Sequence, residues 1–587
     1  MLFHLRTKRP EQNDELKDLK KKSVEDKIRY LSQKTGSCLD SKKSFVKYGY
    51  KNAWKDFLFD IHPEANTKCS SILAKYKVPL LHNCLCDAMK KRLENDLNGQ
   101  AVTLTTNHWT SKPGDSFQCF TIHYIFPMWR LYSYTLKIAK FKGKHTGVNI
   151  GKEIDKLICL DFPVLKTSDQ IFCVVDGAAN MRSGLSNAKF VKSLDSGSLQ
   201  CIDHKLNDIL QIAVEADPTL KAAIQKLNKF TTRLSHSAPC RALLSEVCQD
   251  TQLTYKVLPK PCKTRWNSHC IIIQTMLQMK EAILNLNVYD ISNHFEKVLL
   301  THGDITPLEE FLPILQTIKK TSKWMSCDKE VRNDFALVRI KSLLLTLRKE
   351  IQKDAGSHSY KAFLNKALDL LTEKFPLEGA KISALALGHL FNPVVRGSLL
   401  PDDLKESMIN LLIEEHESTL QFRENKLVRV EPELLFEPSD DPCEENMVNT
   451  LLAAQGSLSL SSMEIEPLRS EFNDYALLPR VGTNTDILEW WRNNEKVIPM
   501  LAKIARGVLA IPPTSSSSER AFSTAGKLLT KHRHNLNSKT TEKMIYINKN
   551  YDHLKDLVKE KWYLNKEDVP SKSLDDISES EPSSASN

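Results

Sequence analysis

The sequence predicts a mixed α/β domain combined with a large all-α domain. Residues 102–140 alternate apolar and polar side chains in three runs, as half-buried strands do, and a continuous apolar run follows at 171–175. From about residue 201 to 424 apolar residues recur instead at helical spacing, and a shorter apolar stretch returns at 487–551. A chain of 587 residues with 41% hydrophobic residues is long enough for more than one such domain.

Two segments precede the first expected strand. Residues 1–35 cluster lysines among acidic side chains with a weak apolar stripe, which predicts a flexible basic arm or a solvated helix. The same cluster could serve as a nuclear-import signal or contact phosphates. Residues 36–100 carry two helical stripes, one beginning at Trp54 and one at Leu85, and are expected to form an N-terminal helical region.

Residues 101–200 contain the strand pattern. Three alternating runs, a helical stripe and the buried strand Ile171–Val175 follow one another, and that strand leads directly into Asp176. This order resembles the start of an RNase H-like fold, in which the first and fourth strands lie side by side. The resemblance implies that positions 107 and 176 face one site.

The remainder of the chain divides by composition. Residues 201–425 are too long and too helical to be a loop and predict an all-α insertion domain. Residues 426–480 are acidic, with prolines and a serine run, and predict a mobile linker. Order is expected to return at 481–552, before an acidic, serine-rich tail at 553–587.

One motif dominates the C-terminal part. Residues 512–526 read Pro-Pro-Thr-Ser-Ser-Ser-Ser-Glu-Arg-Ala-Phe-Ser-Thr-Ala-Gly. The prolines force an extended entry, and the serines offer N-caps for a following helix. Glu519 then falls in or near the first helical turn, where the helix dipole favours a carboxylate. On these residues alone, Glu519 is a helix-terminal glutamate without a chemical role.

This motif, with Arg533-His534-Asn535-Leu536 after it and Trp490-Trp491 before it, resembles the C-terminal dimerisation block of the hAT superfamily of DNA transposases. The resemblance covers about residues 46–551, with five blocks in order, and is nearest to vertebrate BED zinc-finger proteins descended from hAT elements. It implies an RNase H-like catalytic core interrupted by a large helical insertion domain, followed by the dimerisation region. No Cys-x2-Cys occurs in the sequence, so we expect no BED-type finger in it.

In this superfamily three carboxylates hold two divalent metals that cut and join DNA strands. The block Leu104–Ser111 places Asn107 where the family has an aspartate, whereas Asp176 and Glu519 keep their acids. An amide brings no charge and cannot bridge two cations. We therefore expect no enzymatic strand transfer and no cofactor. Asp176 and Glu519 remain as structural residues or as a weak single-metal site with residual Mg²⁺ or Mn²⁺ binding.

Two further blocks resemble DNA-contacting parts of the family. Cys201-Ile202-Asp203-His204 resembles a Cys-x2-His block that lies near DNA, and Thr264–Ser268 a block that supplies an arginine and a tryptophan. Arg265 could pair with a phosphate while Trp266 stacks on an unpaired base. The plain alternatives are a buried cysteine beside a helix-surface histidine, and a core tryptophan beside a surface arginine.

A homodimer is expected because the C-terminal region has more apolar surface than a small lobe can hide alone. The side chains assigned to this surface are Trp490, Trp491, Ile498, Leu501 and Phe522.

Three functions stay open at this point. The first is a domesticated, catalytically inactive nuclear protein that dimerises and binds DNA or chromatin and acts in transcription regulation. The others are an active transposase in which another acid replaces Asn107, and a protein-interaction scaffold without a nucleic-acid role. A net charge of +10 permits a nucleic-acid partner without proving one. Fourteen scattered cysteines indicate a reducing compartment, and neither a membrane span nor a small-molecule substrate is expected.

Overall fold

The computed structural model describes most of the chain between residues 78 and 564. The described ranges are 78–97, 99–111, 114–126, 128–191, 199–260, 266–290, 294–295, 298–353, 356–375, 383–428, 460–528 and 538–564. All of them belong to one compact unit, Val78–Asn587. The expected basic arm and the stripe at Trp54 lie outside the described residues. Among the helices within these ranges, none is long and apolar enough to cross a membrane.

A five-stranded mixed sheet has the strand order β3-β2-β1-β4-β5. Its strands are β1 (Val102–Thr110), β2 (Ser116–Phe126), β3 (Arg130–Lys140), β4 (Ile171–Val175) and β5 (Leu199–Gln200). The first three pair antiparallel, and β4 pairs parallel with β1, from Val102 opposite Ile171 to Thr105 opposite Val174. The first and fourth strands are therefore neighbours, as expected. All five residues of β4 are buried, which explains its unbroken apolar pattern.

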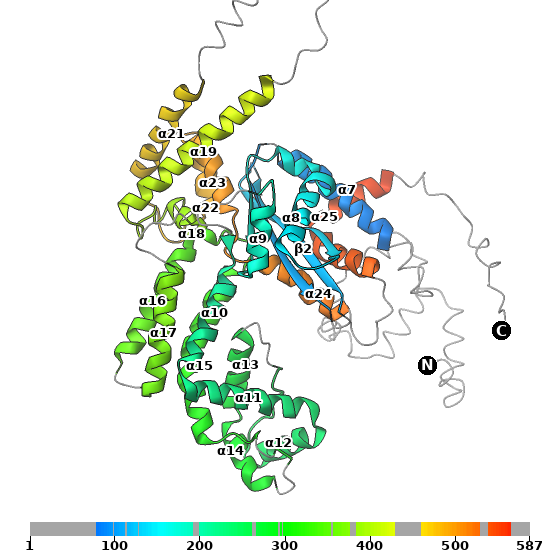
Figure 1. The fold of residues 1–587 in the computed structure, drawn as a ribbon, viewed down its shortest axis with the longest axis vertical. Helices are drawn as coiled ribbons and strands as arrows, with labels where there is room; N and C mark the ends of the chain where they lie inside the picture. Colours follow the sequence, from blue (N-terminus) through cyan, green and yellow to red (C-terminus); the bar gives the residue numbers. More distant parts are fainter. Residues whose placement is uncertain are drawn as a thin grey trace, which may run out of the picture. The chain divides into compact units, whose positions relative to one another are not determined.

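Helices from both ends of the described chain surround this sheet (Figure 1). They are α7 (Val78–Asp96), α8 (Gly147–Lys156), α9 (Ala179–Asn187), α24 (Ser516–Leu528) and α25 (Ser538–Leu564), with a π-helical turn at Leu157–Asp161 and a 3-10 turn at Pro163–Thr167. α7 and α25 lie side by side, and α25 also contacts β3. The Asn550 amide, on α25, exchanges hydrogen bonds with both backbone groups of Thr135, at 3.1 and 2.7 Å. Helix α25 continues to Leu564, beyond the expected end of order at residue 552.

The segment expected to be an all-α insertion consists of helices joined by non-helical connections, such as 251–260 and 326–332, and its described residues after Cys201 contain no strand. It contains α10 (Ile202–Glu215), α11 (Pro218–His236), α12 (Ala238–Asp250), α13 (Trp266–Leu277), α14 (Lys280–Tyr289), α15 (His302–Met325), α16 (Asn333–Gln352) and α17 (His358–Lys374). These helices share one apolar core, with fully buried side chains such as Phe230 and Phe311. The domain boundaries themselves stay predictions.

A second group of helices packs on the face of the sheet that carries Phe172 and Val174. It comprises α18 (Ala384–Leu390), α19 (Asp402–Val428), α21 (Leu460–Leu477), α22 (Ile487–Asn494) and α23 (Pro499–Leu509). The expectation of a mobile linker at 426–480 is wrong for α21, because Leu468, Phe472 and Tyr475 form a buried stripe on that helix. Acidic and serine residues around the stripe concealed it in the sequence.

The apolar residues assigned to a dimer surface are buried within a single chain. Their exposed fractions are 9% for Trp490, 0% for Trp491, Ile498 and Leu501, and 6% for Phe522. The reason given for a dimer surface there is therefore wrong: Phe522 stacks on Trp109 of β1, and Trp491 lies against Trp129, with ring centroids 5.9 Å apart in each pair. Residues distant in sequence, in β1 and next to β3, therefore bury the apolar side chains of the C-terminal region.

Replacing Trp491 with alanine should destabilise the protein by about 3–5 kcal/mol, because it empties a buried aromatic site. It also removes the indole N–H that donates to the Phe391 carbonyl at 3.0 Å. Val288→Ala is the control, since Val288 is 73% exposed, and should change stability by less than about 0.5 kcal/mol. Denaturant and thermal unfolding measure both. Equal effects of the two substitutions would contradict the packing described here.

Candidate functional site

Asn107 and Asp176 lie at the same edge of the sheet. The last pair of the β1–β4 ladder is Thr105 with Val174. Two residues further along, the first segment reaches Asn107 and the second reaches Asp176. Asn107 is 8% exposed, and its Oδ1 accepts a hydrogen bond from the His108 N–H at 2.7 Å. Asp176 directly follows β4, and its Oδ1 accepts from the Ala178 N–H at 3.1 Å.

Two backbone hydrogen bonds fix the start of α10 beside this edge. The Cys201 N–H donates to the Val175 carbonyl at the end of β4, at 2.8 Å. The next N–H, of Ile202, donates to the Pro513 carbonyl at 3.0 Å. Pro513 belongs to the extended entry into α24, so this segment also supplies a hydrogen-bond acceptor for the start of α10. Glu519 lies in the first turn of α24, as expected.

These bonds bring Cys201, His204 and Glu519 together. One possible ligand atom from each lies within 4.8 Å of the others, and His204 Nε2 is 3.7 Å from Glu519 Oε1. Cys201 is fully buried, while the His204 and Glu519 side chains are 30% and 12% exposed. Burial alone would lower the pKa of His204, but the Cys201 sulfur and the nearby carboxylates of Asp176 and Asp203 outweigh it and raise that pKa above its usual value.

The other expected DNA-contacting pair is not placed. Arg265 and the side chain of Trp266 lie outside the described residues. Helix α13 begins at Trp266, and its next residue, Asn267, donates from Nδ2 to Ser322 Oγ of α15 at 3.3 Å.

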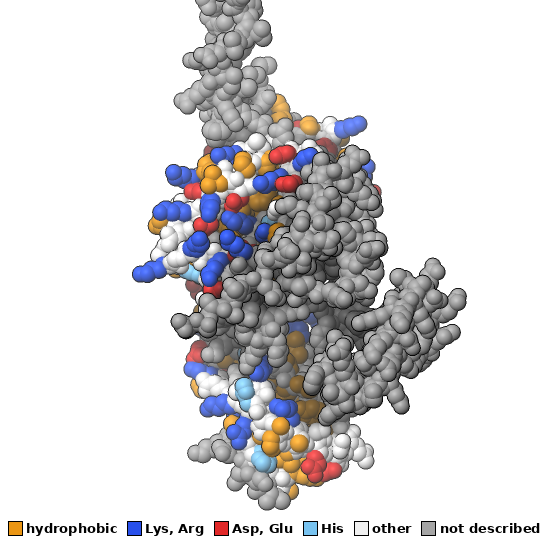
Figure 2. Space-filling view, turned by 90° about the vertical axis from the view of Figure 1, so that its right-hand side faces the viewer, with side chains coloured by type: hydrophobic (Ala, Val, Ile, Leu, Met, Phe, Trp, Pro, Cys, Tyr) orange, Lys and Arg blue, Asp and Glu red, His pale blue; other side chains and the backbone are white. Residues whose placement is uncertain are grey.

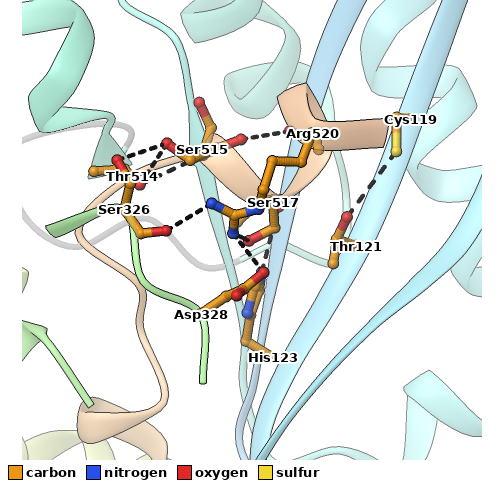
Figure 3. A network of polar contacts seen from close by, with 12 residues as sticks. Cys119, Thr121, His123, Ser326, Asp328, Thr514, Ser515, Ser517 and Arg520 are labelled. Atoms are coloured by element: carbon orange, nitrogen blue, oxygen red, sulfur yellow. Dashed lines mark hydrogen bonds and ion pairs between the residues drawn. The ribbon is translucent and has the colours of Figure 1, made fainter. Parts of the chain in front are cut away.

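A polar network that sequence reasoning missed joins α24 to the loop after α15 (Figure 3). Arg520 donates from Nη1 to the Ser326 carbonyl at 2.7 Å and forms an ion pair with Asp328 through Nη2. Asp203 Oδ2 accepts from Ser326 Oγ at 2.7 Å and from Ser516 Oγ at 3.2 Å. The only sequence signal was the position of Arg520 next to Glu519 in the motif.

A cavity of about 320 Å³ opens beside this network. Its lining includes His204, Glu519 and Arg520, and also Lys319 and Lys323 of α15. Lys323 is exposed and Lys319 is half-buried. The cavity therefore presents cationic side chains together with His204 and Glu519.

Two family models match this chain over regions that contain several of the site residues described above. Residues 471–551 match the hAT family C-terminal dimerisation region, which indicates self-association, and residues 199–312 match the ZBED1 RNase-like helical domain. The first match contains α22, α23 and α24, including Glu519 and Arg520. The second begins just before Cys201.

Similar whole proteins include a putative AC transposase of Zea mays, 23% identical over 75% of this chain and 55% of its own length. Zinc finger BED domain-containing protein 6 of Homo sapiens is 21% identical over 85% of this chain and 54% of its own length. A shorter match, 39% identical over 13% of this chain and 11% of the relative, is to zinc finger BED domain-containing protein RICESLEEPER 3 of Oryza sativa subsp. japonica.

The chain thus spans about half the length of the long relatives it matches. It carries both of the matched regions in the same chain, in the order 199–312 and then 471–551. These matches support an hAT transposase origin for the chain and a resemblance to the zinc finger BED domain-containing proteins.

Proposed function

We propose that this chain is a domesticated, catalytically inactive transposase-like protein of the nucleus that self-associates and binds DNA or chromatin, with a role in transcription regulation. The observation that carries the proposal is Asn107, an amide at the sheet edge beside Asp176. The similarity to BED domain-containing proteins and to a putative transposase supports the origin.

The sheet supports an RNase H-like core for this proposal. Three antiparallel strands come first. A fourth strand, β4, then pairs parallel with β1, on the side of β1 that is not paired with β2. The long helical segment after β5 matches a region described as RNase-like and helical. Carboxylates at the ends of β1 and β4 would meet in such a core, which is why the amide at 107 matters.

The residues present do not fit two magnesium ions. Mg²⁺ prefers six oxygen ligands in near-ideal octahedral geometry. Here Asn107 offers one neutral oxygen that already accepts a hydrogen bond, and the Glu519 carboxylate lies beside an imidazole and a thiol. Nitrogen and sulfur donors suit other metals better than Mg²⁺.

The native chain should therefore show no strand cleavage or strand transfer with Mg²⁺ or Mn²⁺ on nicked and hairpin DNA. Losing one of three negative charges at the site lowers the stabilisation of the transition state by roughly 3–4 kcal/mol. Asn107→Asp is the informative variant and Asn107→Ala its matched control. Cleavage by Asn107→Asp alone would assign the loss to the amide, whereas cleavage by the native chain would favour the active-transposase alternative.

The DNA-binding part of the proposal is based on the Lys and Arg side chains near the site. Lys319, Lys323 and Arg520 line the cavity beside the sheet-edge site. On the upper described part of the face in Figure 2, Lys and Arg side chains predominate over Asp and Glu. Together with the net charge of +10, these surfaces favour binding to the phosphate backbone, which is independent of sequence and sensitive to salt.

Duplex DNA should bind with an affinity that falls steeply with salt, and Lys319→Glu with Lys323→Glu should weaken it. Two lost phosphate contacts would reduce the slope of log affinity against log salt by about 1 to 2. Lys361→Glu with Lys366→Glu on α17 changes the net charge equally, outside the cavity, and should leave the slope nearly unchanged. Fluorescence anisotropy across a salt series measures this. Absence of salt-dependent binding would favour the scaffold alternative.

Self-association must use surfaces other than the buried aromatic residues. Within the matched dimerisation region, 471–551, Leu477 is 83% and Val497 59% exposed. Two large apolar side chains at the surface are reasonable contacts for a second copy of the chain.

We expect light scattering after size-exclusion chromatography to give at least the mass of a dimer. Leu477→Asp with Val497→Asp should shift the population toward monomer, because each places a charge in the contact. Val288→Asp is the matched control, since Val288 is 73% exposed and lies outside the dimerisation region. A monomeric native chain would contradict self-association. An unchanged mass in the double variant would show that the contact lies elsewhere.

A further inference from the structure

We propose that Cys201, His204 and Glu519 bind a single zinc ion. Within the described ranges, these three residues are the one group whose potential ligand atoms lie within 4.8 Å of one another. Thiolate, imidazole and carboxylate are each common zinc ligands, and they make a tetrahedral site with the fourth position left to water. The proposal goes beyond DNA binding and does not depend on it.

The backbone places the three ligands without help from a metal. Cys201 precedes α10 and His204 lies in its first turn, so their spacing of three puts both side chains on one face of the helix. Glu519 comes from the first turn of α24. The bonds from Cys201 N–H to Val175 and from Ile202 N–H to Pro513 hold the two helix starts together. A site fixed in this way needs little rearrangement to accept an ion.

The His204 ring has a nitrogen that could bind a metal ion. His204 Nδ1 is buried and has no hydrogen-bond partner outside the proposed site within the described part of the chain. The Cys201 side chain is the hydrogen-bond neighbour of the ring, and Nε2 faces the Glu519 carboxylate at 3.7 Å. A buried ring nitrogen without a partner is costly, and ligation of an ion would remove that cost at one of the two nitrogens. Asp203, the residue before His204, adds a carboxylate whose Oδ1 is also buried without a hydrogen bond.

Zinc is favoured over magnesium by the donor set. A soft thiolate and an imidazole select zinc-like metals, whereas magnesium takes oxygen ligands. Binding converts the Cys201 thiol to a thiolate and releases its proton to solvent, so affinity should rise with pH. The ion would then link α10 to α24, two helices that are more than 300 residues apart in sequence.

The test is a cobalt titration of the metal-free, reduced full chain in the absence of DNA. We expect about one equivalent of Co²⁺ to give visible tetrahedral bands and a near-ultraviolet sulfur-to-cobalt band, and Zn²⁺ to displace it. Cys201→Ser should abolish the sulfur band. His204→Asn and Glu519→Gln should each lower the affinity by about tenfold or more, as loss of a metal-site residue does.

Cys86→Ser is the matched control. Cys86 Sγ lies 3.6 Å from His82 Nε2 on α7, so it forms a Cys–His pair that does not belong to a three-residue group. Circular dichroism checks that each variant is folded. If Cys201→Ser does not fold, His204→Asn provides the test instead, because the His204 side chain is partly exposed.

Retention of the cobalt spectrum in Cys86→Ser and its loss in Cys201→Ser or His204→Asn supports the proposal. Absence of the sulfur band in the native chain overturns it, as does a spectrum that depends on Cys86 instead. Displacement of cobalt by excess Mg²⁺ also overturns it, because that would indicate an oxygen-ligand site. None of these failures bears on the salt-dependent DNA binding, which is measured separately.

Discussion

The start of α10 is the junction on which the rest of the site depends. Its first two N–H groups lack partners within the helix, as at every helix N-terminus. Here Cys201 donates to the end of β4, and Ile202 donates to the extended segment before α24. Each bond is worth about 1 kcal/mol on its own. Their importance lies in joining the sheet, the all-α segment and the C-terminal motif at one point.

Much of the fold was predictable because strands and helices depend on nearby residues. The alternation at 102–140 and the apolar run at 171–175 predicted β1 to β4 correctly, whereas the two-residue strand β5 was not predicted. The stripe in α21 was missed because acidic and serine residues surround Leu468, Phe472 and Tyr475. Local composition favoured a linker, and burial against α19 and α23 decided otherwise.

The candidate site was only partly predictable, because its members come from distant segments. The resemblance suggested Asp176, Cys201, His204 and Glu519, but spacing alone could not indicate that Arg520 would reach Ser326 and Asp328, 194 and 192 residues away. The burial of Phe522 was missed for the same reason, since Trp109 lies in the first strand. Pairings of this kind follow from topology rather than from local pattern.

The pairing of Asn550 with Thr135 has a further consequence for how other chains can bind. β3 is an outer strand, and outer strands offer free N–H and C=O groups on which another chain can add a strand. Helix α25 occupies this position: Asn550 satisfies Thr135, and Glu542 accepts from the Lys140 N–H at 2.7 Å. At the opposite edge, β5 is only two residues long. Strand addition by a second protein chain is therefore discouraged at both outer strands of the described sheet.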